Sequence, residues 1–164
     1  MAQDLNELLL KKTLTYDEMQ ELASSPDVSI RRNLAKRQDL KPEVLYYLAE
    51  DSDIEVRRTI ALNPTTPRQA DLLLAQDSEE GVRVDITEKI AKLAPGTNAK
   101  QRTKLQSLTY NALMVLSRDQ ATRVRQILAE TLKDVADAPP ELIKRLARDI
   151  ELVVAGPVLQ FSHL

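Results

Sequence analysis

Residues 30–35 read Ile-Arg-Arg-Asn-Leu-Ala, and this pattern returns twice along the chain at a fixed interval of 26 residues. The later copies are Val56-Arg57-Arg58-Thr59-Ile60-Ala61 and Val82-Arg83-Val84-Asp85-Ile86-Thr87. A period of this length is typical of stacked supersecondary units, each of which contacts only its neighbours. The recurrence therefore predicts an elongated all-α array.

The residues around this pattern keep the same register, so that 14–39, 40–65 and 66–93 form three copies of one unit. In each copy a turn or N-cap precedes a short helix, and an Asp/Ser turn then caps a second helix. Pro42 and Pro67 stand at the start of their units, where the missing N–H of proline is not needed. Helices this short cannot bury their apolar faces alone, so we expect stability to come from stacking.

The flanking residues extend the array on both sides. Asp4 and the glutamate three residues later predict a capped helix ending near Lys12, so residues 1–93 comprise a terminal cap helix and three repeats. Residues 94–100, which include Ala-Pro-Gly-Thr-Asn, are the expected joint. Residues 101–164 carry looser copies of the unit, and both parts can belong to one continuous α-solenoid of about five helical hairpins.

The last unit departs from the pattern. Ala155 stands where the other units have arginine, and the helix expected from Leu152 to Leu164 is interrupted at Gly156-Pro157. Residues 158–161 are apolar or nearly so. Three explanations are open: this segment packs back on the array, the chain is cut from a longer one, or the segment pairs with another copy.

Residues 42–67 contain, in order, Pro-Glu-Val-Leu, Leu-Ala-Glu-Asp, Val-Arg-Arg and Asn-Pro-Thr-Thr-Pro. This run resembles the leucine-rich-repeat-variant unit, which is similar in style to HEAT repeats, and the resemblance covers residues 14–93. It implies a right-handed superhelix of short α- and 3₁₀-helices. Some members of that family carry an iron–sulfur cluster on cysteines, and this feature is not transferred because the chain has no cysteine. Residues 137–159 are similar to an uncharacterised bacterial family, domain-of-unknown-function family 2336, which implies a helical fold and no particular activity.

Composition narrows the classes of function. Without cysteine, the chain cannot form disulfides or thiolate metal sites, which fits a reducing compartment. The first apolar stretch, 8–10, is too short and too acidic for a signal peptide, and no apolar run reaches the roughly 20 residues of a membrane helix. We therefore expect a cytoplasmic protein with no membrane partner.

Charge is divided unevenly between the two parts of the chain. Residues 1–93 hold 13 Lys and Arg against 18 Asp and Glu, whereas residues 94–164 hold 10 against 7. The formal net charge is −2, which does not favour nucleic acid as a partner. The asymmetry itself is mild, but it can steer a partner or assist self-association.

One arginine recurs in each unit, and two interpretations of this column are open. The column is Arg31, Arg57, Arg83 and Arg125. It could bind an acidic or phosphorylated ligand, since guanidinium is a planar set of donors. We favour a structural ladder in which each arginine pairs with a turn carboxylate. The expected carboxylates are Asp27, Asp53, Asp77 and Asp119.

A second column, Arg32 and Arg58, is broken by Val84. Residues that not every unit needs are better candidates for binding, so we predict Arg32 and Arg58 as partner-binding residues whose removal leaves stability nearly unchanged. Tyr46 is a third candidate, because we expect it on the surface while Tyr47 lies at the edge of the core.

No catalytic, cofactor or metal site is predicted. His163 is the one histidine and stands at the chain end, so a histidine-based triad or paired-histidine metal site cannot form within the chain. The three glycines, Gly81, Gly96 and Gly156, are too far apart for a phosphate-binding loop.

The interpretation that follows is a non-enzymatic scaffold for protein–protein interaction with a protein or peptide partner. Two alternatives stay open. One is nucleic-acid binding through the more basic second half. The other is homo-oligomerisation through the apolar C-terminal segment, as a module of a longer bacterial protein.

Overall fold

The computed structural model describes residues 4–95, 100 and 102–161, and every regular element among them is helical. The elements are α1 (Leu5–Leu9), α2 (Tyr16–Ala23), α3 (Val28–Ala35), α4 (Pro42–Ala49), α5 (Ile54–Leu62), α6 (Arg68–Leu74), α7 (Glu80–Ile90), the 3₁₀-helix η1 (Ala91–Leu93), α8 (Lys104–Leu116), α9 (Thr122–Leu132), α10 (Pro140–Ala147) and α11 (Leu152–Phe161). The described part of the chain is therefore all-α, as the sequence predicts.

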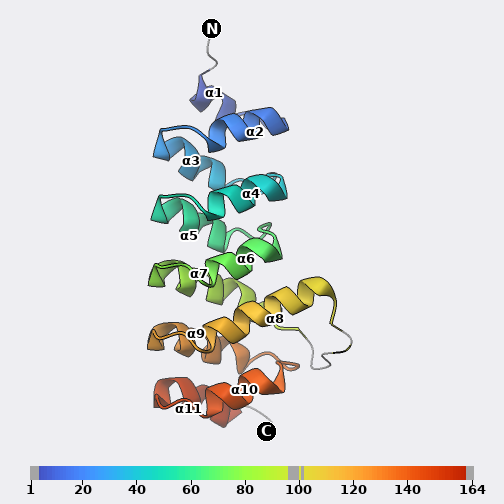
Figure 1. Cartoon of the computed structure of the whole chain (residues 1–164), viewed down its shortest axis with the longest axis vertical. Helices are drawn as coiled ribbons and strands as arrows, with labels where there is room; N and C mark the ends of the chain where they lie inside the picture. Colours follow the sequence, from blue (N-terminus) through green and yellow to red (C-terminus); the bar gives the residue numbers. More distant parts are fainter. Residues whose placement is uncertain (1–3, 96–99, 101, 162–164) are drawn as a thin grey trace.

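The helices lie in two layers along one long axis, with α1 and α11 at opposite ends of the stack (Figure 1). We call α2, α4, α6, α8 and α10 the even layer, and α1, α3, α5, α7, α9 and α11 the odd layer. Each odd helix packs on the next one, and in the even layer α2 packs on α4, α4 on α6 and α6 on α8. Contacts across the stack are thus made between neighbouring hairpins.

Short polar side chains fix where several helices begin. Thr15 accepts from the backbone N–H of Glu18, and the Glu18 carboxylate accepts from the backbone N–H of Thr15 at 2.8 Å. Thr103 and Gln106 make the same reciprocal pair at the start of α8. Asp4 caps α1 by accepting from the backbone N–H two residues later. Each cap satisfies N–H groups that the first helical turn would leave unpaired.

Every hairpin contributes the same two apolar positions to a continuous core. One position lies in or just after the last turn of the even helix and the other in the first turn of the odd helix. The buried residues there are Leu22, Leu48, Leu74, Leu116 and Leu146, followed by Ile30, Val56, Val82, Val124 and Val154. Removing such a side chain from water contributes about 2 kcal/mol, and the neighbouring hairpin covers it.

The fourth hairpin is larger than the others. α8 has 13 residues, against 8 in α2 and α4, and it projects beyond the stack (Figure 1). Residues 96–99 of the predicted joint 94–100 lie outside the described residues. Packing nevertheless continues past this point, because α6 contacts α8 and α7 contacts α9.

The predicted interruption of the last helix is wrong. α11 runs from Leu152 to Phe161 and passes through Pro157. A proline inside a helix removes one hydrogen bond and usually ends or kinks it. Val154 and Val158, four residues apart and both fully buried, hold α11 against the core on either side of Pro157. Residues 162–164 lie outside the described residues.

Candidate functional site

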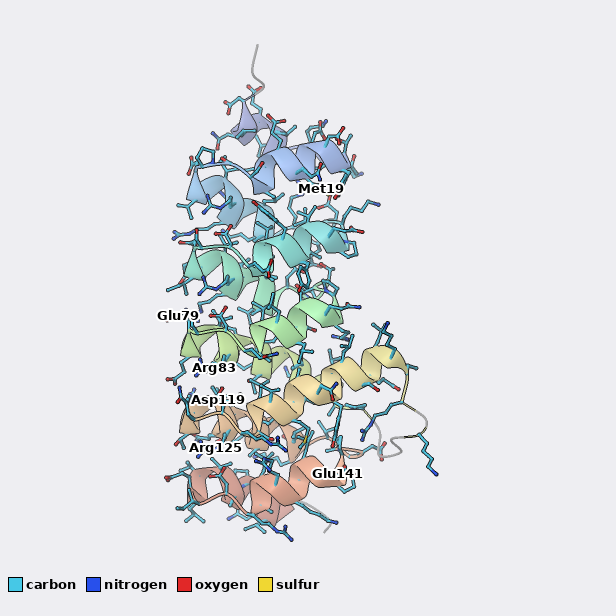
Figure 2. The ribbon with its side chains drawn as sticks, in the orientation of Figure 1. Met19, Glu79, Arg83, Asp119, Arg125 and Glu141 are labelled. Atoms are coloured by element: carbon cyan, nitrogen blue, oxygen red, sulfur yellow. The ribbon has the colours of Figure 1, made fainter. Side chains whose placement is uncertain are left out.

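The recurring arginines form a row of ion pairs along one side of the stack, which we call the arginine ladder. In each pair the arginine lies on an odd helix and the aspartate in the turn of the next hairpin. Nε donates to one carboxylate oxygen at 2.6–2.8 Å and Nη2 to the other at 3.2 Å. The pairs are Arg31–Asp51, Arg57–Asp77, Arg83–Asp119 and Arg125–Asp149. Figure 2 shows Arg83, Asp119 and Arg125 following one another along this side.

Backbone groups complete each pair. Nη1 of Arg57 donates at 2.9 Å to the carbonyl of Asp51, and Asp77 accepts at 2.9 Å from the backbone N–H of Glu79. The same two bonds recur in the other pairs. The hydrogen bond to Asp77 raises the pKa of Arg57. Because these side chains are only 12% and 8% exposed, the ladder joins hairpins rather than presenting charge to solvent.

The carboxylates of the ladder differ in part from the predicted set. That set was Asp27, Asp53, Asp77 and Asp119. The ladder instead contains Asp51, Asp77, Asp119 and Asp149. Asp27 caps α3 by accepting at 2.9 Å from the backbone N–H of Ser29, and Asp53 caps α5. The physical reason is reach, since each guanidinium extends to a carboxylate in the turn of the following hairpin and bonds to its own turn only at a backbone carbonyl.

Both ends of the ladder carry uncharged residues. Position 25, the equivalent of Asp51 in the first hairpin, is serine, and position 155, the equivalent of Arg125 in the last, is alanine. Within the described residues, no ladder arginine precedes position 25, so an aspartate there would have no partner. Likewise, no ladder aspartate follows position 155, so an arginine there would have no partner. Ladder charges therefore occur only where the adjacent hairpin supplies the counter-charge.

Ladder geometry does not depend on the sequence separation of the partners. The two residues of a pair are 20, 20, 36 and 24 positions apart in successive rungs. The Nε–Oδ2 distance changes by no more than 0.2 Å across them, from 2.6 to 2.8 Å. The insertion before α8 is thus accommodated without disturbing contact between hairpins.

The second arginine column is also paired within the chain. Arg32 donates to Asp53 at 2.7 and 2.9 Å, and Arg58 donates to Asp85 at 2.6 and 3.3 Å. The arginine side chains stay 43% and 41% exposed, while that of Asp85 is 7% exposed. Both predicted binding residues thus hold hairpins together, and the expectation that their removal leaves stability unchanged no longer follows.

The tyrosines of α4 both face outward. Tyr46 is 38% exposed, and Tyr47, which was predicted at the edge of the core, is 55% exposed. Val44, Leu45 and Leu48 are buried and anchor the helix, so Tyr46 and Tyr47, which stand between Leu45 and Leu48, turn toward solvent. Tyr47 and Tyr16 line a hollow of about 320 Å³ between α2 and α4.

A third column, missed in the sequence, joins each of the first three hairpins to the helix or hairpin before it. Arg37, Asn63 and Lys89 stand 26 residues apart. Arg37 donates to the carbonyls of Leu9, Lys11 and Lys12 at 2.9–3.1 Å.

The next two members repeat this arrangement. Asn63 donates to the carbonyls of Ala35 and Arg37 at 3.0 and 2.9 Å. Lys89 donates to the carbonyl of Asn63 at 3.1 Å and to buried Asp71 at 2.8 Å, and burial lowers the pKa of Lys89. These bonds satisfy carbonyls that the ends of the odd helices leave unpaired. The equal spacing was visible in the sequence, but the column was missed because its three residue types share only a side chain that can donate hydrogen bonds.

The exposed face of the even layer carries hollows between successive helices. Besides the one between α2 and α4, hollows of about 440 Å³ and 640 Å³ lie between α6 and α8 and between α8 and α10. One exposed residue per hairpin follows the even helix at the same position. These residues are Ser24, Glu50, Gln76, Arg118 and Arg148, so the face changes from acidic or neutral to basic along the stack.

Two further properties concern the described residues alone. None of them form a cluster of three or more His, Cys, Asp or Glu side chains that could hold a metal ion. No helix in this part of the chain combines the length and apolarity required to cross a bilayer.

The chain matches no protein-family model, and comparison with curated proteins finds no significant match. The resemblances to leucine-rich-repeat-variant units and to family 2336 therefore stay predictions. Function has to be argued from the surface of the stack.

We predict strong coupling within a ladder pair. Arg57→Ala and Asp77→Ala should each lower the free energy of unfolding by about 3 kcal/mol, because each leaves a poorly hydrated charge unpaired. The double variant should lose clearly less than the sum. Urea unfolding followed by circular dichroism measures all three. Arg123→Ala, at an exposed position, is the control and should change stability by less than about 0.5 kcal/mol. Additive losses would contradict the pairing.

The second column should divide into a critical and a dispensable pair. Arg58→Ala strands Asp85, which is almost fully buried, whereas Arg32→Ala leaves Asp53 with its bond from the backbone of Val56. We expect Arg58→Ala to destabilise by about 2 kcal/mol and Arg32→Ala clearly less. Thermal unfolding of the two variants gives the comparison, and equal losses would refute it.

Acid should weaken the ion pair between Arg32 and Asp53, the N-cap residue of α5. The bond from Arg32, assisted by the backbone N–H of Val56, lowers the pKa of Asp53 to about 2. Since the unfolded value is about 4, this contribution to stability is complete above about pH 4 and is lost as the pH falls to about 2. Asp53→Asn should flatten that fall by about 1 kcal/mol, given the exposure of Arg32. Urea titrations at stepped pH test this, and parallel curves would contradict it.

Proposed function

We propose that the chain is a non-enzymatic helical-repeat scaffold that binds a protein or peptide on the exposed face of the even layer. In this proposal its hairpins form a right-handed α-solenoid of five units. The observation that carries the proposal is the set of hollows along the even layer, several of which are lined in part by residues of the arginine ladder. Arg31 lines a hollow beside the one between α2 and α4, Arg83 lines the hollow between α6 and α8, and Arg125 lines the hollow between α8 and α10.

Exposed apolar residues support a polypeptide ligand on this face. Tyr47, Leu73 and Val115 stand at equivalent positions, one residue before the buried leucine of their helices. Tyr47 is 55% exposed and Val115 is 38% exposed, whereas Leu73 is half-buried. Side chains of this kind, placed at the spacing of the hairpins, suit the apolar side chains of a bound segment.

The fixed alignment of the hairpins also supports the scaffold proposal. The ladder and the carbonyl-binding column fix successive hairpins in register, so a ligand that spans several hollows meets a surface whose parts are already positioned. Less conformational freedom is lost on binding to such a surface than to a flexible one.

A second candidate is self-association through the last hairpin. Ile150 is 92% exposed and Leu152 is 80% exposed. Two strongly exposed apolar side chains, two residues apart at the start of α11, are typical of an interaction surface. Light scattering across a range of concentrations tests this candidate, and a monomer at every concentration would exclude it.

Site-specific photo-crosslinking in cells of the native host tests the scaffold proposal. A benzophenone amino acid replaces Val115 on the even face or, as the matched control, Leu62, which is 50% exposed on the odd layer. We expect one or a few host proteins to crosslink at Val115 with at least about tenfold higher yield than at Leu62. Equal yields from the two faces, or no crosslink from either, would remove the proposed surface.

A further inference from the structure

The hollow between α8 and α10 concentrates positive charge, and we call it the basic notch. Its volume is about 640 Å³, and its exposed lining includes Arg118, Lys144, Arg145 and Arg148. Two aspartates of the lining, Asp119 and Asp149, already accept from ladder arginines. Glu141 on α10, labelled in Figure 2, is the one carboxylate of the lining not committed to a ladder pair.

These cations are unlike the other arginines of the chain. Most described arginines form an ion pair with a carboxylate, namely Arg31, Arg32, Arg37, Arg57, Arg58, Arg68, Arg83 and Arg125. Arg102 instead lies 3.9 Å from the ring centroid of Tyr110. Among the described residues, no carboxylate lies within 4.0 Å of Arg118, Arg145 or Arg148. Of the five described arginines without such an ion pair, three therefore lie in one hollow. The other two are Arg102 and Arg123, and the charge of Arg145 also helps to lower the pKa of Asp149.

An apolar side chain accompanies this charge. Ile150 lines the notch and is 92% exposed, whereas the equivalent turn positions of earlier hairpins hold Ser52, Ser78 and Gln120. Met114 lines the notch from α8. The surface therefore offers several cations beside an exposed hydrophobic residue.

We infer that the basic notch binds an acidic segment of a partner protein, in which carboxylates alternate with apolar residues. The inference rests on the proposed scaffold function and names the chemistry of its partner. Arg118 and Arg148 occupy equivalent positions in consecutive hairpins, and both line the notch. An extended segment rises about 3.3 Å per residue, so a segment with a carboxylate at every second residue offers one about every 7 Å, and different carboxylates of the same segment meet the two guanidinium groups. Ile150 takes an apolar side chain of the same segment.

The composition of the notch favours a polypeptide over nucleic acid. Three carboxylates stand among its cations and would oppose a continuous phosphate backbone, while a segment with spaced carboxylates avoids them. No aromatic residue lines the notch to stack on bases. The acidic excess of residues 1–93 also repels a long polyanion.

Fluorescence anisotropy with defined probes on the full chain tests this inference. The first probe is a short fluorescein-labelled peptide in which Glu alternates with Leu, and the second is a labelled oligothymidine of similar length. The notch variant is Arg118→Ala/Arg148→Ala. The control variant, Lys104→Ala/Arg123→Ala, removes the same charge from exposed positions in the same half of the chain, outside the notch. Thermal unfolding of both variants checks that the fold is kept.

We expect the Glu–Leu peptide to bind the wild-type chain, to bind the notch variant at least about tenfold more weakly, and to bind the control within about twofold. Absence of peptide binding at about millimolar protein, or equal losses in the two variants, would overturn the inference. Oligothymidine binding that only the notch variant loses would overturn it in favour of nucleic acid. If the peptide fails while the Val115 crosslinks persist, the acidic partner is wrong but the scaffold proposal stands; if the crosslinks vanish too, both fail.

Discussion

The structure depends on hairpins that are too short to bury their own apolar surface. α2, α3 and α4 have eight residues each, little more than two turns, and isolated helices of this length are unstable in water. Leu48 and Val56 are fully buried only because adjacent hairpins cover them. Stability therefore belongs to the contact between units, and the polar interactions of the chain are concentrated at that contact.

Apolar burial alone does not fix how two hairpins align, since it has no direction. The paired bonds between Arg57 and Asp77 require a specific orientation, because a guanidinium fork meets both carboxylate oxygens in one plane. Asn63 adds bonds in the other direction, to carbonyls of the preceding hairpin. Each of the central hairpins is thus held to both neighbours by directional bonds, and a shift of register would break both sets.

Much of this arrangement could be predicted from the sequence, for identifiable reasons. The 26-residue recurrence predicts the repeating hairpins, and the spacing of apolar residues predicts which face of each helix is buried. The carboxylate partner of each arginine was harder to predict. Arg31 pairs with Asp51 and not Asp27 because its long side chain reaches the next unit. The spacing of residues within one unit does not show this. The orientation of Tyr47 likewise depended on which side of α4 met its neighbours, and the passage of α11 through Pro157 on burial of the valines around it.

The distribution of arginine partners separates structural from functional charge better than recurrence does. The interruption of their column at Val84 singled out Arg32 and Arg58 as candidates for binding, and both are committed to carboxylates of the chain. Arg118 and Arg148 drew less attention because they replace Glu50 and Gln76 at a position that varies between units. Variation between units does not by itself mark an outward-facing position, since Arg37, Asn63 and Lys89 differ and all three join hairpins. What distinguishes Arg118 and Arg148 is that no carboxylate of the described residues forms an ion pair with them. The unpaired cations of the basic notch occur where the repeat permits variation, and that is where a stacked scaffold can acquire a specific partner without weakening its own contacts.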